Sequence, residues 1–124
     1  MNDDKPRQIV IIGGVACGPK AAARARRRDP EAEITLIEKG EYLSYAGCGL
    51  PYYIGGGVRS FEGLMSTPYG VVRDREYFEN FKGLNIRIAT LAEKIDRDRS
   101  VVHVKDLKSG ERDEIPYDSL VLAT

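Results

Sequence analysis

The residue best suited to covalent chemistry is Cys48, one of two cysteines in the chain. It lies in residues 41–57, a segment dense in glycine and tyrosine, and Gly47 and Gly49 flank it directly. We expect a glycine-flanked turn there that opens a short helix, whose free N–H groups stabilise a thiolate. Two interpretations follow, a nucleophilic thiol and a buried or incidental cysteine, and this segment taken alone favours the second.

A second group of residues has the order of a dinucleotide site. An apolar run at residues 9–12 precedes a glycine-rich turn and an Ala/Arg-rich stretch, and a second apolar run at residues 34–37 ends at Glu38. Strand, glycine turn, helix and acid-terminated strand in this order form a βαβ unit that binds a dinucleotide. Glu38 stands where a carboxylate accepts hydrogen bonds from ribose hydroxyls.

The turn itself departs from the usual glycine pattern. Gly13 and Gly18 match the outer glycines of G-x-G-x-x-G, but Val15 replaces the middle one and Gly14 occupies the variable position. The glycines let the backbone approach a pyrophosphate, and the start of the helix favours the phosphate charge. A glycine turn without a ligand is the alternative, and the strand, helix and acid around the turn argue against it.

The predicted helix begins near Gly18 and ends at residues 29–30, and it carries a basic stripe. Lys20, Arg24 and Arg27 are spaced i, i+4, i+7 and therefore share one face. This face is either solvated or docks a phosphorylated ligand. Arg26 and Arg28 lie off that face, and we expect them to be ordinary surface charges.

The remaining elements complete an α/β fold with a parallel sheet, a crossover helix and a small antiparallel β-meander. Residues 61–65 are expected to form a loop, and residues 73–83 an amphipathic helix with Gly83 as its C-cap and with Tyr77, Phe78 and Phe81 toward the core. Further strands are predicted at residues 86–89, 92–96, 101–104, 111–115 and 120–124, the last of them buried.

Length and charge limit the possible classes. The chain has 124 residues, enough for one domain, and its 19 basic and 19 acidic residues balance, so no overall field attracts nucleic acid or a membrane. It contains no long apolar run and no leader pattern, and we expect a soluble, cytoplasmic protein. Two cysteines without a C-x-x-C indicate no zinc site, and the single histidine, His103, is expected to be an ordinary strand residue rather than a metal ligand.

Taken together, these blocks resemble the N-terminal flavin-binding part of the pyridine nucleotide-disulfide oxidoreductases, in the branch that uses a single redox cysteine. That branch contains coenzyme A-disulfide reductases, NADH-dependent persulfide or polysulfide reductases, and NADH oxidases and peroxidases. The resemblance implies a Rossmann-like three-layer domain with FAD as cofactor and NAD(P)H as reductant of the complete enzyme. It is carried by residues 11–16, 37–39, 44–56, 67–68 and 117–124.

The resemblance also implies roles for individual residues. Cys48 is the catalytic thiol. The FAD-binding positions are Gly13, Gly14, Val15, Ala16, Gly18, Glu38 and Lys39. The positions that bind the phosphates of a coenzyme A substrate, or line the approach to the thiol, are Lys20, Arg24, Arg27, Ser44 and Gly47, and Lys20 replaces a hydroxyl found in one reductase.

Departures from relatives help to choose among the activities. Tyr53 stands where two-cysteine reductases carry the partner cysteine, so Cys48 must cycle as a mixed disulfide, a persulfide or a sulfenic acid. Ala16 stands where peroxidases and many oxidases have a histidine, which favours reduction of coenzyme A disulfide or coenzyme A persulfide. An NADH oxidase or peroxidase is the alternative, and a non-catalytic nucleotide-binding module is the third hypothesis. Cys17 is expected to be a packing residue.

The resemblance places residues 1–124 in the first part of an FAD-binding domain. The NAD(P)H-binding domain and the dimerisation domain of the family, which makes a homodimer of the complete enzyme, are not among these residues. We therefore expect the chain alone to bind FAD weakly if at all, and to turn nothing over with NADH.

Overall fold

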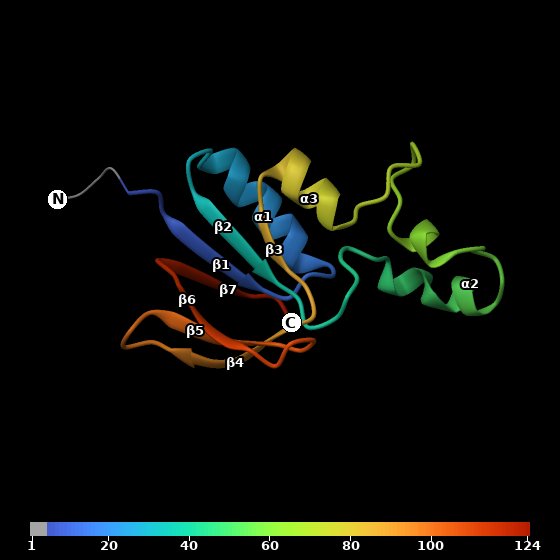
Figure 1. Cartoon of the computed structure of the whole chain (residues 1–124). Helices are drawn as coiled ribbons and strands as arrows, with labels where there is room; N and C mark the ends of the chain where they lie inside the picture. Colours follow the sequence, from blue (N-terminus) through green and yellow to red (C-terminus); the bar gives the residue numbers. More distant parts are fainter. Residues whose placement is uncertain (1–4) are drawn as a thin grey trace.

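A four-stranded parallel sheet forms the middle layer of the structure, a computed structural model that describes residues 5–124 (Figure 1). Its order is β3-β2-β1-β7. The strands are β1 (Gln8–Ile12), β2 (Glu33–Ile37), β3 (Asn85–Arg87) and β7 (Ser119–Leu122). The central strand β1 pairs with β2 on one side and β7 on the other, as its apolar sequence predicts for a strand buried inside a parallel sheet.

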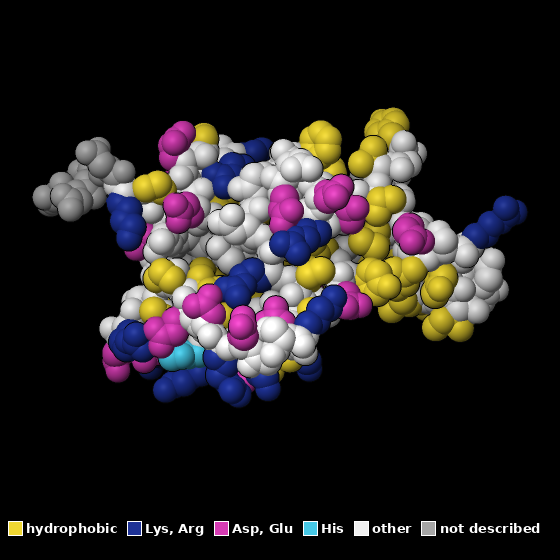
Figure 2. All heavy atoms as spheres, in the orientation of Figure 1, with side chains coloured by type: hydrophobic (Ala, Val, Ile, Leu, Met, Phe, Trp, Pro, Cys, Tyr) yellow, Lys and Arg dark blue, Asp and Glu magenta, His cyan; other side chains and the backbone are white. Residues whose placement is uncertain are grey.

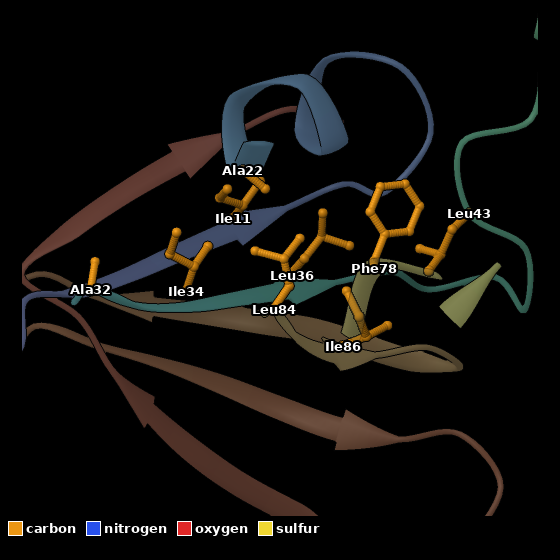
Figure 3. Packing of buried hydrophobic residues seen from close by; sticks show 9 residues of the cluster. All are labelled: Ile11, Ala22, Ala32, Ile34, Leu36, Leu43, Phe78, Leu84 and Ile86. Atoms are coloured by element: carbon orange, nitrogen blue, oxygen red, sulfur yellow. The ribbon is translucent and has the colours of Figure 1, made fainter. Parts of the chain in front are cut away.

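Two helices cover one face of this sheet (Figure 1). Helix α1 (Cys17–Arg28) is the crossover between β1 and β2, and α3 (Arg75–Lys82) leads into β3. Small Ala22 allows α1 to lie close to Ile11 and Ile34, and Phe78 of α3 extends the same buried cluster toward Leu43 (Figure 3). The βαβ unit predicted from the sequence is therefore present.

An antiparallel meander forms the third layer. Its strands are β4 (Thr90–Asp96), β5 (Val101–Asp106) and β6 (Arg112–Pro116), in the order β4-β5-β6. Val102 and Val104 pack against Val10 and Ile37 of the parallel sheet and form a second buried cluster. Helices, parallel sheet and meander confirm the predicted three-layer α/β architecture.

The outer face of the meander carries charges of both signs, as Figure 2 shows. Arg112 Nε lies 2.9 Å from Glu93, and Arg99 Nη2 lies 2.7 Å from Glu114, beside His103. These hydrogen bonds from Arg112 and Arg99 hold the pKa values of Glu93 and Glu114 below their ordinary values. Because these ion pairs lie at exposed positions, each of them contributes little to the stability of the fold.

The structure corrects three expectations about local packing. Residues 61–65 are not a loop, because Phe61–Leu64 forms a 3₁₀ helix, η2. Phe81 of α3 does not reach the core and is 76% exposed, since Phe78 takes the position that faces the sheet. Strand β7 is only half-buried, and Leu122 is 63% exposed, because β7 lies at the edge of the parallel sheet.

Capping residues fix both ends of α3. Asp74 accepts a hydrogen bond from the Tyr77 N–H at 2.9 Å and caps the first turn. Gly83 ends the helix with φ +59°, the left-handed conformation that favours glycine, and confirms the predicted C-cap.

None of the helices in residues 5–124 has the length and hydrophobicity that crossing a bilayer requires.

Arg26 differs most from its expected role. It is not an ordinary surface charge, because its guanidinium donates to four backbone carbonyls. Two of them, Pro30 and Ala32, follow α1, and the other two, Lys82 and Gly83, end α3. Arg26 therefore ties the C-terminal ends of the two helices together, whereas the neighbouring Arg28 is exposed.

Candidate active site

The glycine turn between β1 and α1 leaves no room for a side chain at Gly13 or at Gly18. Gly13 has φ +112°, and a Cβ there would lie 2.1 Å from the Ala123 carbonyl oxygen. A Cβ on Gly18 would lie 1.7 Å from the carbonyl oxygen of Gly13. Both contacts are with backbone, which cannot swing aside, so glycine is required at both positions for the turn to close against β7.

The first turn of α1 is open to an anion. Its N-cap is Ala16, which has no side-chain oxygen, and the first turn carries no acidic residue. The N–H groups at the start of this 12-residue helix therefore have no side-chain cap, and the helix dipole favours negative charge there. This is the arrangement that binds a pyrophosphate next to a glycine turn.

Glu38, directly after β2, lies beside the same turn. Its Oε1 accepts a hydrogen bond from the Gly14 N–H at 3.0 Å, and its Oε2 accepts from the Gly40 N–H. A cavity of about 280 Å³ opens next to Glu38 and Lys39 at the carboxyl end of the sheet. Its remaining wall includes residues that sequence reasoning missed, Thr90, Leu91 and Ala92 of β4 and the terminal Thr124.

Cys48 lies outside the glycine turn, in the segment that connects β2 to α3. It is the middle residue of a 3₁₀ turn, η1 (Gly47–Gly49), which runs directly into α2 (Leu50–Ile54). The predicted glycine-flanked turn before a short helix is thus confirmed. The thiol is free and exposed, so the structure does not support the interpretation of a buried packing cysteine.

Packing of an aromatic cluster holds the segment around Cys48 in place. The Phe61 ring contacts three tyrosines, with ring centroids 4.6 Å from Tyr42, 5.6 Å from Tyr45 and 5.8 Å from Tyr53. A Cβ on Gly49 would lie 2.7 Å from the Leu64 side chain, so η1 and η2 touch closely. Tyr53, which occupies the position of a second cysteine in two-cysteine relatives, is therefore part of this support.

A larger pocket of about 720 Å³ lies between α1, α3 and the segment that leads to Cys48. Ser44, Tyr45 and Ala46 form the wall toward the thiol. Lys20 and Arg27, the first and last residues of the predicted basic stripe on α1, also line the pocket. The pocket has an apolar floor as well, because Phe78 contributes to it. A long ligand with charged and apolar parts fits such a lining.

Two further cations of this pocket were not predicted. Arg73 precedes α3 and Lys82 is its last residue, and both line the pocket with Lys20 and Arg27. None of the four takes part in an ion pair within residues 5–124, whereas Arg75, Arg87, Arg99, Lys108 and Arg112 all pair with carboxylates. Within residues 5–124, four cations without carboxylate partners around one pocket favour a polyanion there.

Not every predicted site residue lines the pocket. Val15, Ala16 and Ser44 do so, but Arg24, Gly47 and Cys48 do not. Arg24 is exposed on α1, and its contact with a ligand stays a prediction. Cys17 is not a packing residue, because it is exposed at the start of α1 and contributes to the pocket wall.

Comparison with known proteins identifies the family. Residues 7–124 match the family model of the pyridine nucleotide-disulphide oxidoreductases. The chain belongs to this family. The resemblance inferred from the glycine turn, Glu38 and the Cys48 segment is therefore confirmed.

Relatives within the pyridine nucleotide-disulphide oxidoreductases agree in sequence and fold. Coenzyme A disulfide reductase of Staphylococcus haemolyticus is 33% identical over an alignment of 120 residues, and the match covers 94% of this chain and 25% of the relative. The NAD-dependent persulfide reductase from A. fulgidus is 47% identical with a TM-score of 0.90, over 94% of this chain and 21% of that one. Reduced CoADR-RHD from Bacillus anthracis is 38% identical with a TM-score of 0.86, over 95% and 20%.

The chain spans about a quarter of the length of the curated relatives it matches. Both solved relatives superimpose on nearly all of its residues, so they share its overall fold. In residues 5–124 no group of three His, Cys, Asp or Glu side chains is placed to hold a metal ion.

Proposed function

We propose that this chain supplies the flavin site and the redox cysteine of an FAD-dependent NAD(P)H:disulfide oxidoreductase. Its substrate is coenzyme A disulfide, or a coenzyme A persulfide or polysulfide, and the complete enzyme is a homodimer. The observation that carries the proposal is the pocket in which four cations without carboxylate partners, from α1 and from the ends of α3, lie along the approach to Cys48. Relatives named for coenzyme A disulfide and for persulfide support the same substrate class.

The residues of the glycine turn fit FAD. Gly13 and Gly18 keep the backbone free of side chains, the uncapped first turn of α1 receives the pyrophosphate, and the Glu38 carboxylate accepts from ribose hydroxyls. Lys39 and β4 form the wall of the adjoining cavity. FAD, when bound, would supply the hydride chemistry: transfer of two electrons from NAD(P)H to the reduction of a sulfur–sulfur bond.

Cys48 carries out the sulfur chemistry. Its thiolate attacks one sulfur of the bound disulfide, the substrate S–S bond breaks, and one coenzyme A leaves as a thiolate. The other half stays on Cys48 as a mixed disulfide, because Tyr53 stands where a second cysteine would resolve it. A persulfide substrate reacts at the same thiol and uses the same phosphate contacts.

The pocket positions the substrate for this attack. Lys20 and Arg27 neutralise phosphate charge along α1, and Arg73 and Lys82 do so from the opposite wall. The apolar side chain of Phe78 and the ring of Tyr77 contact the uncharged arm that joins the phosphates to the sulfur. Ser44 and Tyr45 guide that arm toward η1, where Cys48 is exposed.

Neutralising the pocket tests this function directly. In a Cys17→Ser chain, where Cys48 is the one remaining thiol, Lys20→Ala with Arg27→Ala should slow formation of the coenzyme A adduct by about tenfold or more. Each lost charge-assisted hydrogen bond is worth about 1.5–3 kcal/mol, and about 1.4 kcal/mol corresponds to a factor of ten. The rate is measured by intact mass under non-reducing conditions after addition of coenzyme A disulfide.

Arg28→Ala with Arg97→Ala is the matched control, because it also removes two positive charges, from exposed positions outside the pocket. It should leave the rate within about twofold. Equal slowing by all variants would show that only net charge matters and would contradict the pocket. Rapid formation of a sulfenic acid at Cys48 with oxygen consumption would instead favour the NADH oxidase or peroxidase alternative.

A further inference from the structure

An exposed aromatic ring on α3 lies beside the 720 Å³ pocket. Phe81, in the last turn of α3, is 76% exposed and lies just outside the pocket lining. Its ring contacts Tyr77, with the ring centroids 5.5 Å apart and the planes tilted by 37°. Tyr77 lines the pocket and lies one turn earlier on the same side of α3, so the two rings extend the pocket wall to an open aromatic face.

This aromatic face is at the end of the pocket that lies away from the thiol. Ser44, in the wall toward the thiol, donates its backbone N–H to the glycine turn that precedes α1. Arg27 and Lys82 line the pocket near the C-terminal ends of α1 and α3, and Arg26 ties those two ends together. The lining thus follows α1 from its first residue to Arg27, about 15 Å along the helix axis.

Two cations lie at the same end as the aromatic face. Neither Arg27 nor Lys82 takes part in an ion pair within residues 5–124. Lys82 Nζ lies 5.9 Å from the centroid of the Tyr77 ring, so positive charge and aromatic surface adjoin each other. A nucleotide combines phosphate charge with a flat base, and this end of the pocket offers a partner to each.

We infer that Phe81 is a specificity-determining residue, whose open face stacks with the purine base of the substrate while Arg27 and Lys82 bind the adjoining phosphates. The inference rests on the proposed function for the substrate, because coenzyme A disulfide carries an adenine nucleotide at the end opposite its sulfur. Tyr77 supports the Phe81 ring from the other side. Packing of α3 does not require an aromatic residue at position 81, since Phe78 faces the sheet.

Two disulfides that differ in the nucleotide test this role in the Cys17→Ser chain. Coenzyme A disulfide carries the base, whereas phosphopantetheine disulfide has the same arm and a phosphate but no base. Phe81→Ala should slow labelling of Cys48 by coenzyme A disulfide by about fivefold or more, measured by intact mass under non-reducing conditions. It should change the rate with phosphopantetheine disulfide by less than about twofold. Equal slowing with both disulfides, or slowing with neither, would overturn the inference.

Two further variants separate stacking from a general apolar contact. Phe81→Trp should keep the rate with coenzyme A disulfide within about twofold, whereas Phe81→Leu should lose about as much as Phe81→Ala, because leucine has no flat face. A full rate in Phe81→Leu would contradict stacking. Tyr69→Ala is the matched control, since Tyr69 is an aromatic residue that is 94% exposed and lies outside the pocket, and it should leave both rates unchanged.

Glutathione disulfide separates this inference from the proposed function. If the Cys17→Ser chain with Phe81 intact shows no preference for coenzyme A disulfide over glutathione disulfide, the proposed function is refuted. If that preference is present and Phe81→Ala retains it in full, the inference alone is refuted.

Discussion

Gly18→Ala is expected to lower the free energy of unfolding by about 3–5 kcal/mol, a large part of the stability of a domain of this size. The added Cβ would lie 1.7 Å from the carbonyl oxygen of Gly13, and that residue is itself held at φ +112° against Ala123. Relieving the overlap requires α1 to move away from β1, and this opens the buried contact between Ala22 and Ile11. Urea unfolding followed by far-ultraviolet circular dichroism measures the change.

Gly47→Ala is the matched control for this result. A Cβ at Gly47 would have nothing within 4 Å, and its φ lies outside the left-handed region. The same substitution should therefore change the free energy of unfolding by less than about 1 kcal/mol. If both variants were equally stable, the close approach of the turn to β7 and α1 would be wrong.

Arg26→Met is expected to cost about 2–3 kcal/mol of stability, the second-largest effect. The variant keeps a long apolar side chain but loses the hydrogen bonds of the guanidinium to Pro30, Ala32, Lys82 and Gly83, three of them at 2.7 Å. The carbonyls that end α1 and α3 are then left to water, and the two helices separate more easily. The midpoint of the same urea transition reports the loss.

Arg28→Met removes an equal charge two residues away, at an exposed position. It should shift the free energy of unfolding by no more than about 0.5 kcal/mol. An equal loss in the two variants would mean that charge, rather than the tie between the helix ends, decides the stability. Arg26→Lys should recover little, because an ammonium cannot reproduce the planar fork that reaches carbonyls on both sides.

The parts of this molecule that were predicted from the sequence are those that short stretches determine. Apolar runs, the glycine turn and Glu38 define the βαβ unit within one continuous segment, and Gly83 marks the end of α3 by its own conformation. The Cys48 turn was identified because two glycines flank the thiol. In each case the signal and the structure involve neighbouring residues.

The parts that were not predicted depend on residues far apart in the chain. Arg26 contacts carbonyls 56 and 57 positions away, and nothing in its own helix indicates them. Arg73 and Lys82 reach the pocket because α3 lies beside α1 on the sheet. The exposure of Cys17 likewise follows from how the turn meets that pocket. Phe81 is exposed because Phe78 and, in part, Tyr77 take the positions of α3 that pack against the core.

Whether Cys48 and the pocket form one site is tested most directly by the intact mass of the Cys17→Ser chain, under non-reducing conditions, after exposure to coenzyme A disulfide and, in parallel, to glutathione disulfide. We expect a reductant-sensitive coenzyme A adduct on Cys48 that forms at least about tenfold faster than the glutathione adduct, because the pocket cations bind the phosphates. Equal, slow reaction with both disulfides would contradict the claim that this thiol and this pocket form one site.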